Sequence, residues 1–334
     1  MVDVKSKGRI ILAAFIIAGL AGVVAFSFGR PKSQVKFVRV LSYSAFLNSW
    51  GPAKEIARLF HEKTGFEVEY IDAGDAGLLL KKLELFPSDV VIGLDQLSID
   101  QARGAHKWRP LQPLEPDAHH QPEFLAFDYG PMTFVYRDGE VRPPAQLDDL
   151  LKPEYKSAIA LQDPRASTPG LQFFFWVLDL KGVEAGLEYL RSLKPNLQSV
   201  APSWSGAYGI FTRGQAKLVF SYLTSPIYHW VIEEKREFKP VVLAEALPVQ
   251  VEYVAVPEKC EHCEAGEAFA RFLLEPDIQR VIMNKNFMLP VAKAVAEGTP
   301  FAQLPQVEEY RWKNLPELMK RRDELLDRWR QLGL

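Results

Sequence analysis

The chain has 334 residues, 48% of them hydrophobic and 25% charged, a balance typical of a globular protein of about two domains. This composition is unlike that of collagen, a coiled coil or an extended disordered chain. Without residues 1–30 the sequence holds 36 basic and 41 acidic residues, a formal charge of −5. Such mild acidity argues against a nucleic-acid partner, which would need a basic surface.

The first 30 residues differ from the rest of the sequence. Lys5, Lys7 and Arg9 precede an apolar run at 10–28, which is the pattern of a signal peptide. The run is also long enough for an uncleaved membrane anchor. Basic residues before it keep the N-terminus in the cytoplasm, so the rest of the chain is expected to be exported. We therefore predict an exported protein whose contact with the membrane is limited to residues 1–30.

Strand and helix patterns alternate after this segment, in the order that gives parallel βαβ units. The expected elements are strands at 36–43, 66–70 and 89–94, a helix between Trp50 and Gly65, and a helix capped by Asp75.

A second α/β set follows residues 124–137, which are too long for a strand of one sheet and contain Gly130 and Pro131 at their middle. We interpret this segment as a crossover between two lobes, with a return crossover at 249–256. Between the crossovers, the expected elements are strands at 158–162 and 217–222 and helices at 168–180, 186–193, 205–212 and 227–236.

Helical patterns dominate the last part of the chain. Residues 264–274 predict a helix that Pro276 breaks, and residues 287–291 are expected to pass near the hinge. One face of a closing helix at 315–332 is marked by Leu318, Leu325, Trp329 and Leu332.

These elements predict an α/β protein of two lobes. Lobe 1 comprises residues 31–130 and 252–295, and lobe 2 comprises residues 131–251. The pattern does not assign the C-terminal helical segment, residues 296–334, to either lobe. Clefts between hinged lobes are common sites for small molecules.

The stretch from Trp204 to Trp230 carries the strongest indication of a site. Its strand ends at Tyr222, and Ser225 is expected to cap the next helix, with Pro226 at the first position. In open α/β sheets, ligands bind beyond the carboxyl ends of strands, where helix N-termini also point. These residues are therefore expected to lie beside a ligand, the alternative being that the aromatic side chains belong to the core.

Three segments of the chain resemble a known family: FDYGPMTFVYR at 127–137, LQDPRASTPGL at 161–171 and WSGAYGIFTRGQAKLVFSYLTSPIYH at 204–229. They are similar to segments of periplasmic thiamine-binding proteins, and the similarity continues from about residue 37 to residue 295. It implies the two-lobed type II periplasmic-binding-protein fold, with a ligand cleft between the lobes. It also implies a monomeric substrate-binding subunit in the periplasm that delivers its ligand to an ABC permease.

The resemblance implies a set of ligand-binding positions in this chain. They are Tyr43 and Trp50 near the cleft mouth, Asp75, Ala76, Ser167, Thr168, Trp204, Tyr222, Leu223, Thr224, Ser225, Tyr228 and Phe287. Ser167 and Thr168 match positions that contact a phosphate when the ligand carries one. The chain departs from the family at Ala76, where relatives have glycine, and at Phe287, where they have tryptophan.

The chemistry of thiamine explains why such residues would suit it. Its flat, permanently positive thiazolium is attracted to aromatic faces, here those of Trp204, Tyr222, Tyr228 and Phe287. The Asp75 carboxylate can pair with the cation or accept from the amine, or can serve only as a helix cap. The helix start at 167–170 offers free N–H groups to a phosphate, or is capped in the ordinary way.

Other side chains near these positions, and the two cysteines, carry separate expectations. Arg165 is expected to pair with Asp163 rather than to bind a ligand. Cys260 and Cys263 are the only cysteines, and a disulfide is expected in an oxidising compartment. A redox centre and a metal site, which would need further ligands, are the alternatives.

The sequence thus predicts a binding protein with thiamine, its monophosphate or its diphosphate as ligand, and with no cofactor or metal. Another cationic or phosphorylated molecule, or iron(III), is the alternative ligand. A membrane-tethered sensor is the alternative role if residues 1–30 stay attached. An enzyme is not expected, because the sequence contains no G-x-S-x-G, H-E-x-x-H or P-loop motif.

Overall fold

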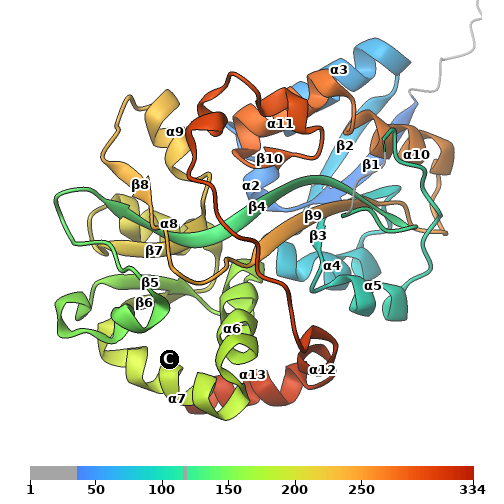
Figure 1. The fold of residues 1–334 in the computed structure, drawn as a ribbon. Helices are drawn as coiled ribbons and strands as arrows, with labels where there is room; N and C mark the ends of the chain where they lie inside the picture. Colours follow the sequence, from blue (N-terminus) through green and yellow to red (C-terminus); the bar gives the residue numbers. More distant parts are fainter. Residues whose placement is uncertain (1–35, 116–118) are drawn as a thin grey trace, which may run out of the picture. The chain divides into compact units, whose positions relative to one another are not determined.

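One strand of 14 residues, β4 (Phe124–Arg137), joins the two halves of the fold (Figure 1). Its first part pairs with β9 (Val249–Ala255) and its second part with β7 (Leu218–Tyr222), both in antiparallel register. The computed structural model describes residues 36–115 and 119–334. The segment predicted as a crossover is thus a single strand, and its length is explained because it serves two groups of strands.

Within the described residues, the strands follow the order β2-β1-β3-β9-β4-β7-β5-β6, and β8 and β10 also pair with β4. The remaining strands are β1 (Phe37–Ser42), β2 (Glu67–Asp72), β3 (Val90–Asp95), β5 (Ile159–Gln162), β6 (Leu197–Ala201), β8 (Phe238–Pro240) and β10 (Leu289–Pro290). β1 is parallel to β2 and β3, and β5 is parallel to β6 and β7. The alternation of strands and helices therefore predicted the parallel part of each lobe correctly.

Helices connect these strands. The α-helices are α2 (Ser44–Leu47), α3 (Ala53–Thr64), α4 (Leu79–Leu85), α5 (Ile99–Ala105), α6 (Thr168–Lys181), α7 (Val183–Leu193), α8 (Trp204–Thr212), α9 (Pro226–Val231), α10 (Cys263–Phe272), α11 (Pro276–Asn286), α12 (Leu315–Lys320) and α13 (Arg322–Gln331). Short 3₁₀ helices are η1 (Ala76–Leu78), η2 (Leu147–Leu151), η3 (Pro153–Tyr155), η4 (Lys194–Asn196), η5 (Lys293–Ala296) and η6 (Pro300–Gln303).

Local backbone chemistry explains where several helices begin and end. Gly65 has a φ of 75° and ends α3, as predicted. The predicted helix at 264–274 extended too far, since α10 ends at Phe272; Pro276 begins the next helix, because proline suits the first position. The predicted helix at 227–236 was too long: α9 ends at Val231, and the left-handed φ of 56° at Glu234 is incompatible with a continued helix.

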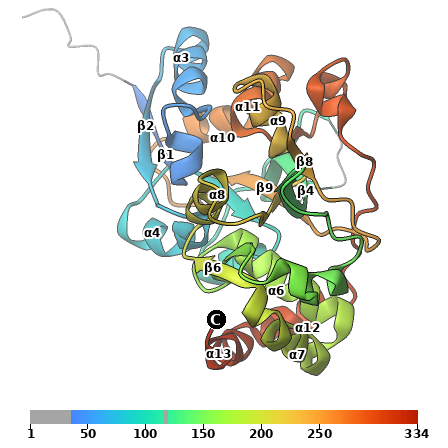
Figure 2. The same ribbon diagram turned by 90° about the vertical axis from the view of Figure 1, so that its left-hand side faces the viewer.

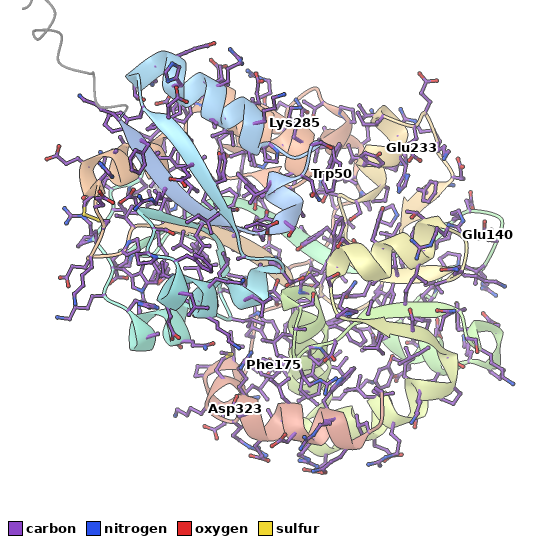
Figure 3. All side chains as sticks on the ribbon, turned by 180° about the vertical axis from the view of Figure 1, so that it is seen from behind. Trp50, Glu140, Phe175, Glu233, Lys285 and Asp323 are labelled. Carbon is purple, nitrogen blue, oxygen red and sulfur yellow. A yellow bond between two sulfur atoms is a disulfide. The ribbon has the colours of Figure 1, made fainter. Side chains whose placement is uncertain are left out.

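Each lobe has apolar cores on both faces of its strands. In lobe 1, Val40 and Ile92 face one core, whereas Leu41 and Val91 face the other, because successive side chains of a strand point to opposite faces. Lobe 2 is organised around aromatic side chains of α6, and Phe175 of that helix is fully buried (Figure 3).

The C-terminal helices pack on lobe 2, beside α6 and α7 (Figures 1 and 2). The buried Trp329 ring lies 5.3 Å from that of Phe174 on α6, edge to face. The predicted closing helix is in fact two helices, α12 and α13, which meet at Arg321. Its predicted apolar face is buried in the lobe 2 core, since Leu318, Trp329 and their neighbours on that face are at most 9% exposed.

The segment at 1–30, predicted to be a signal peptide or anchor, lies outside the described residues. In the part of the chain that the structure does describe, no helix is long and apolar enough to cross a membrane.

Candidate ligand-binding cleft

A cavity of about 600 Å³ lies between the two lobes. It is lined by residues that follow the carboxyl ends of β1, β2, β6 and β7, and by β9 of the hinge. Ten of the thirteen predicted ligand-binding residues line it, namely Tyr43, Trp50, Asp75, Ala76, Thr168, Trp204, Tyr222, Ser225, Tyr228 and Phe287. The topology therefore brings together residues that are far apart in the sequence, at the edge where α/β proteins bind ligands.

Aromatic rings form two groups in the cavity. Trp204 stacks on Tyr208 with ring centroids 5.0 Å apart, and Tyr222 lies 6.3 Å from Trp204. On the other side, Tyr228 meets Phe287 edge to face at 5.4 Å. The Trp204 indole N–H donates to the Ser221 hydroxyl at 2.9 Å, which holds the ring in place.

Two of the predicted aromatic residues differ from the others, Trp50 in its exposure and Phe287 in its backbone conformation. Trp50 is 46% exposed, on the segment between α2 and α3 (Figure 3), as suits a residue at the cleft mouth. Phe287 ends α11 in the left-handed conformation, with φ 55° and ψ 38°. This conformation costs a non-glycine residue about 1 kcal/mol, and such strain often occurs at functional sites.

Three of the predicted residues, Leu223, Thr224 and Ser167, do not line the cavity. Leu223 is 3% exposed and packs in the lobe 2 core, because its N–H still pairs with the Pro131 carbonyl of β4 and the strand register turns its side chain inward. Thr224 is fully buried in the turn after β7, and Ser167 is 2% exposed beneath the start of α6.

Ser225 lines the cavity, but the prediction that it caps α9 was wrong. Its backbone is already helical, with φ −54° and ψ −35°, so its side chain makes no capping hydrogen bond. Its hydroxyl instead bonds to the Ser221 hydroxyl at 2.7 Å. The result is a chain of hydrogen bonds from Trp204 through Ser221 to Ser225.

Asp75 combines both of the roles considered for it. Its carboxylate accepts from the Gly77 N–H at 3.2 Å, which caps η1, and it also lines the cavity. Burial raises the pKa of Asp75, while the nearby N–H groups of Gly77, Trp204 and Thr168 act in the opposite direction. Because Trp204 and Thr168 begin α8 and α6, the carboxylate from lobe 1 faces two helix N-termini of lobe 2, including the predicted phosphate seat.

Several lining residues were missed by sequence reasoning. They are Ser44, Tyr208, His229, Glu233, Gln250, Glu252, Asn286 and Met288. Glu252 had a recognisable signal, because it is a carboxylate within the otherwise apolar run at 249–256. Tyr208 had a weaker one, since it lies one helical turn after Trp204.

With the geometry established, sequence comparison identifies the family. The sequence profile of bacterial extracellular solute-binding proteins matches residues 49–287. The chain belongs to this family.

Individual relatives agree with that assignment. The thiamine-binding periplasmic protein of Brucella melitensis is 32% identical over 88% of this chain and 89% of its own length. The protein of the same name from Escherichia coli is 31% identical over 76% of this chain and 80% of its own length. A solved structure of a periplasmic thiamin binding protein superposes with a TM-score of 0.83 at 28% identity, over 91% of this chain and 98% of that one. The predicted two-lobed fold and the resemblance to thiamine-binding proteins are both confirmed.

The ion pair predicted beside the cleft of this solute-binding protein is present. Arg165 Nε donates to both Asp163 carboxylate oxygens, at 2.9 and 3.0 Å. This pairing holds the pKa of Asp163 below its ordinary value even though burial acts in the opposite direction.

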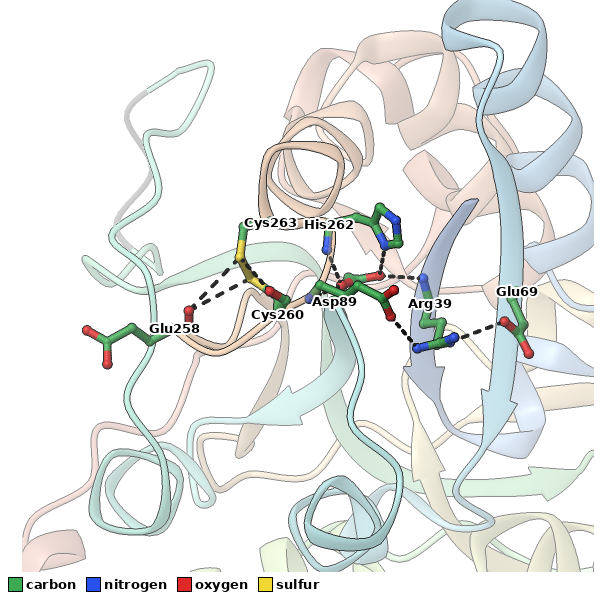
Figure 4. Close-up of polar contacts among 8 residues, drawn as sticks. Arg39, Glu69, Asp89, Glu258, Cys260, His262 and Cys263 are labelled. Carbon is green, nitrogen blue, oxygen red and sulfur yellow. Dashed lines mark hydrogen bonds and ion pairs between the residues drawn. A yellow bond between two sulfur atoms is a disulfide. The ribbon is translucent and has the colours of Figure 1, made fainter. Parts of the chain in front are cut away.

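The two cysteines are joined as a disulfide, away from the cavity at the start of α10 (Figure 4). The loop that holds them is anchored by Asp89, which is 1% exposed. Asp89 accepts hydrogen bonds from the backbone N–H groups of Arg39, Glu261 and His262, at 2.8 to 2.9 Å. Among the described residues, no group of three or more His, Cys, Asp or Glu side chains could hold a metal ion.

Proposed function

We propose that this solute-binding protein captures thiamine in the cleft between its lobes and delivers it to an ABC permease. One observation carries the proposal: seven aromatic and three acidic residues line the cavity, and none of the described residues that line it is Lys or Arg. Each contact between a cation and an aromatic face contributes roughly 0.5 to 2 kcal/mol. A cavity with this lining favours a flat cation over an anion.

The relatives support the same ligand. Proteins named for binding thiamine are 31–32% identical over most of this chain. Phe287, where the resemblance implies a tryptophan, keeps an aromatic face in the cavity, so the change reduces the stacking area without removing the wall.

We further propose that thiamine is preferred over its phosphates. Backbone N–H groups at the start of α6 would suit a phosphate, but the Asp75 carboxylate already faces them. A phosphate would therefore approach a like charge, with no Lys or Arg among the described lining residues to compensate.

The wider role follows from the family. Relatives with this fold include the substrate-binding protein of a spermidine/putrescine ABC transporter. We propose that the protein acts as a monomer in the periplasm, closes its lobes around the ligand and carries out no chemical reaction.

Isothermal titration calorimetry and tryptophan fluorescence of the purified protein test this proposal. Thiamine should bind and quench fluorescence, thiamine monophosphate should bind more weakly, and spermidine and iron(III) should not compete. Trp204→Phe should remove much of the quenching, whereas Trp312→Phe, a substitution outside the cavity, should not. Failure of thiamine to bind, or displacement of it by spermidine or iron(III), would contradict the proposed ligand.

A further inference from the structure

Three carboxylates lie side by side on the hinge strands. Glu252 on β9 is the register partner of Asp128 on β4 and of Asp95 on β3. All three are buried, with exposed fractions of 4%, 0% and 1%. Like charges placed opposite one another in a sheet repel, so this row of carboxylates is not expected to be fully ionised.

Glu252 is the member of the row that lines the ligand cavity. Neutral side chains hold it in place. The Tyr43 hydroxyl donates to Oε2 of Glu252 at 2.6 Å, and Gln250 Nε2 donates to Oε1 at 3.1 Å. Asn286 Nδ2 donates to Asp128 at 2.8 Å and to the Tyr43 hydroxyl at 3.0 Å. Glu252 and Asp128 are therefore linked, through Tyr43 and Asn286, by hydrogen bonds that involve no cation.

Two acceptor atoms of this network have no partner. Oε1 of Gln250 and Oδ1 of Asp128 are buried and make no hydrogen bond. Gln250 is 2% exposed and lines the cavity. A buried acceptor without a donor is costly, so a ligand that brings an N–H group to this end of the cavity would satisfy it. Together, Gln250 and Glu252 present acceptors to such a group.

The protonation of the row depends on its surroundings. Burial raises the pKa of Glu252 to about 7, and it raises that of Asp128 well above its ordinary value, with the Glu252 charge acting in the same direction. The titratable and charged groups that face the row, or lie near it, are Tyr43, Asp75, Tyr222 and, beside Asp95, Arg322. Burial raises the pKa of both tyrosines well above the ordinary value, so they stay neutral donors.

We propose that Gln250 and Glu252, with Asp128 behind them, form a proton-linked recognition site for the exocyclic amine of the ligand at the hinge end of the cavity. This inference rests on the proposed function and names the part of thiamine that meets the hinge. When the amine N–H binds, Glu252 gives up its proton to the solvent and accepts the amine as a carboxylate. No bond to the ligand is made or broken.

The sign of the pH effect follows from this exchange. Because the ligand binds the ionised form, affinity should rise with pH while Glu252 titrates. With a pKa of about 7, affinity should increase about tenfold between pH 6 and pH 8. His229, which lines the cavity on α9, has a pKa lowered by burial, so any effect of its titration on affinity should appear at lower pH.

Calorimetry of the protein with thiamine at pH 6, 7 and 8, in two buffers of different ionisation enthalpy, measures the affinity and the number of protons released on binding. We expect the tenfold rise in affinity, with the release of about half a proton at pH 7 and nearly one at pH 6. Glu252→Gln should bind with little dependence on pH, whereas Glu297→Gln, an exposed control, should keep the wild-type slope. An analogue with oxygen in place of the exocyclic amine should bind more weakly and release no proton.

The outcomes separate this inference from the proposed function. Tight binding of thiamine with a flat pH profile and no proton release would overturn the hinge site and leave the function intact. A slope that persists in Glu252→Gln would also overturn it. If Glu252→Gln does not fold, the number of protons that the wild-type protein releases and the affinity of the analogue test the inference instead. Absence of thiamine binding at every pH would overturn the proposed function and this inference with it.

Discussion

Replacement of Tyr222 tests whether the aromatic lining binds the ligand or only fills the core. The Tyr222 ring lines the cavity, 6.3 Å from that of Trp204, and its inner part packs against the lobe 2 core. Tyr222→Ala removes one aromatic face, worth roughly 0.5 to 2 kcal/mol to a bound cation. The dissociation constant for thiamine should therefore rise about 2- to 30-fold.

Tyr222→Phe is the matched variant, because it keeps the ring and removes only the hydroxyl. It should bind thiamine within about twofold of wild type, since the cation is attracted to the ring face. Both variants are measured by calorimetry at one pH, after thermal unfolding has shown that they are folded. Wild-type affinity in a folded Tyr222→Ala protein would refute the reasoning and place Tyr222 in the core alone. An equal loss in both variants would show that the hydroxyl, and not the ring, binds the ligand.

Four further predictions concern the cleft and its surroundings. Asp75→Asn should increase the affinity for thiamine monophosphate relative to thiamine, as measured by competition, because it removes the negative charge that faces the start of α6. Gly130→Ala should weaken thiamine binding in calorimetry, because a Cβ atom there would lie 3.0 Å from the Tyr222 ring and 3.1 Å from a second lining residue. In chemical denaturation, Asp89→Ala should cost about 3 kcal/mol or more, because three backbone N–H groups lose their acceptor. Replacing Cys260 and Cys263 with serine should cost only about 2 kcal/mol, as expected for a very short closed loop.

Each of these has a control or a contrary result. Gly104→Ala is the control for the glycine, since a Cβ atom there meets nothing within 4 Å, and equal effects of the two substitutions would refute the steric argument. An unchanged preference in the Asp75 variant would show that its charge does not oppose a phosphate. If loss of the disulfide costs more than loss of the Asp89 carboxylate, the covalent link and not the hydrogen bonds anchors the loop.

Local patterns were sufficient for much of the fold. The apolar strands, Gly65 at the end of α3 and the proline at the start of α6 depend on neighbours within a few residues. For the same reason, the Asp75 cap could be predicted before the structure was known. Most of the predicted residues that line the cavity follow strand ends, where the chemistry of turns and caps shows in the sequence.

Features that the sequence did not show depend on register and on contacts between distant segments. Leu223 turns into the core because its backbone still pairs with β4, which no local pattern shows. Ser225 bonds to Ser221 because the turn after β7 is already helical.

By itself, the sequence determined the alternation of strands and helices, the two crossovers and the aromatic character of the cleft, because these depend on composition and short-range spacing. The tertiary structure alone decided that Glu252 lies between Asp95 and Asp128, that α12 and α13 pack on lobe 2, and that Asp75 faces helices of the other lobe. These arrangements arise when strands far apart in the chain pair in one register, and that register places the charges on which binding is proposed to depend.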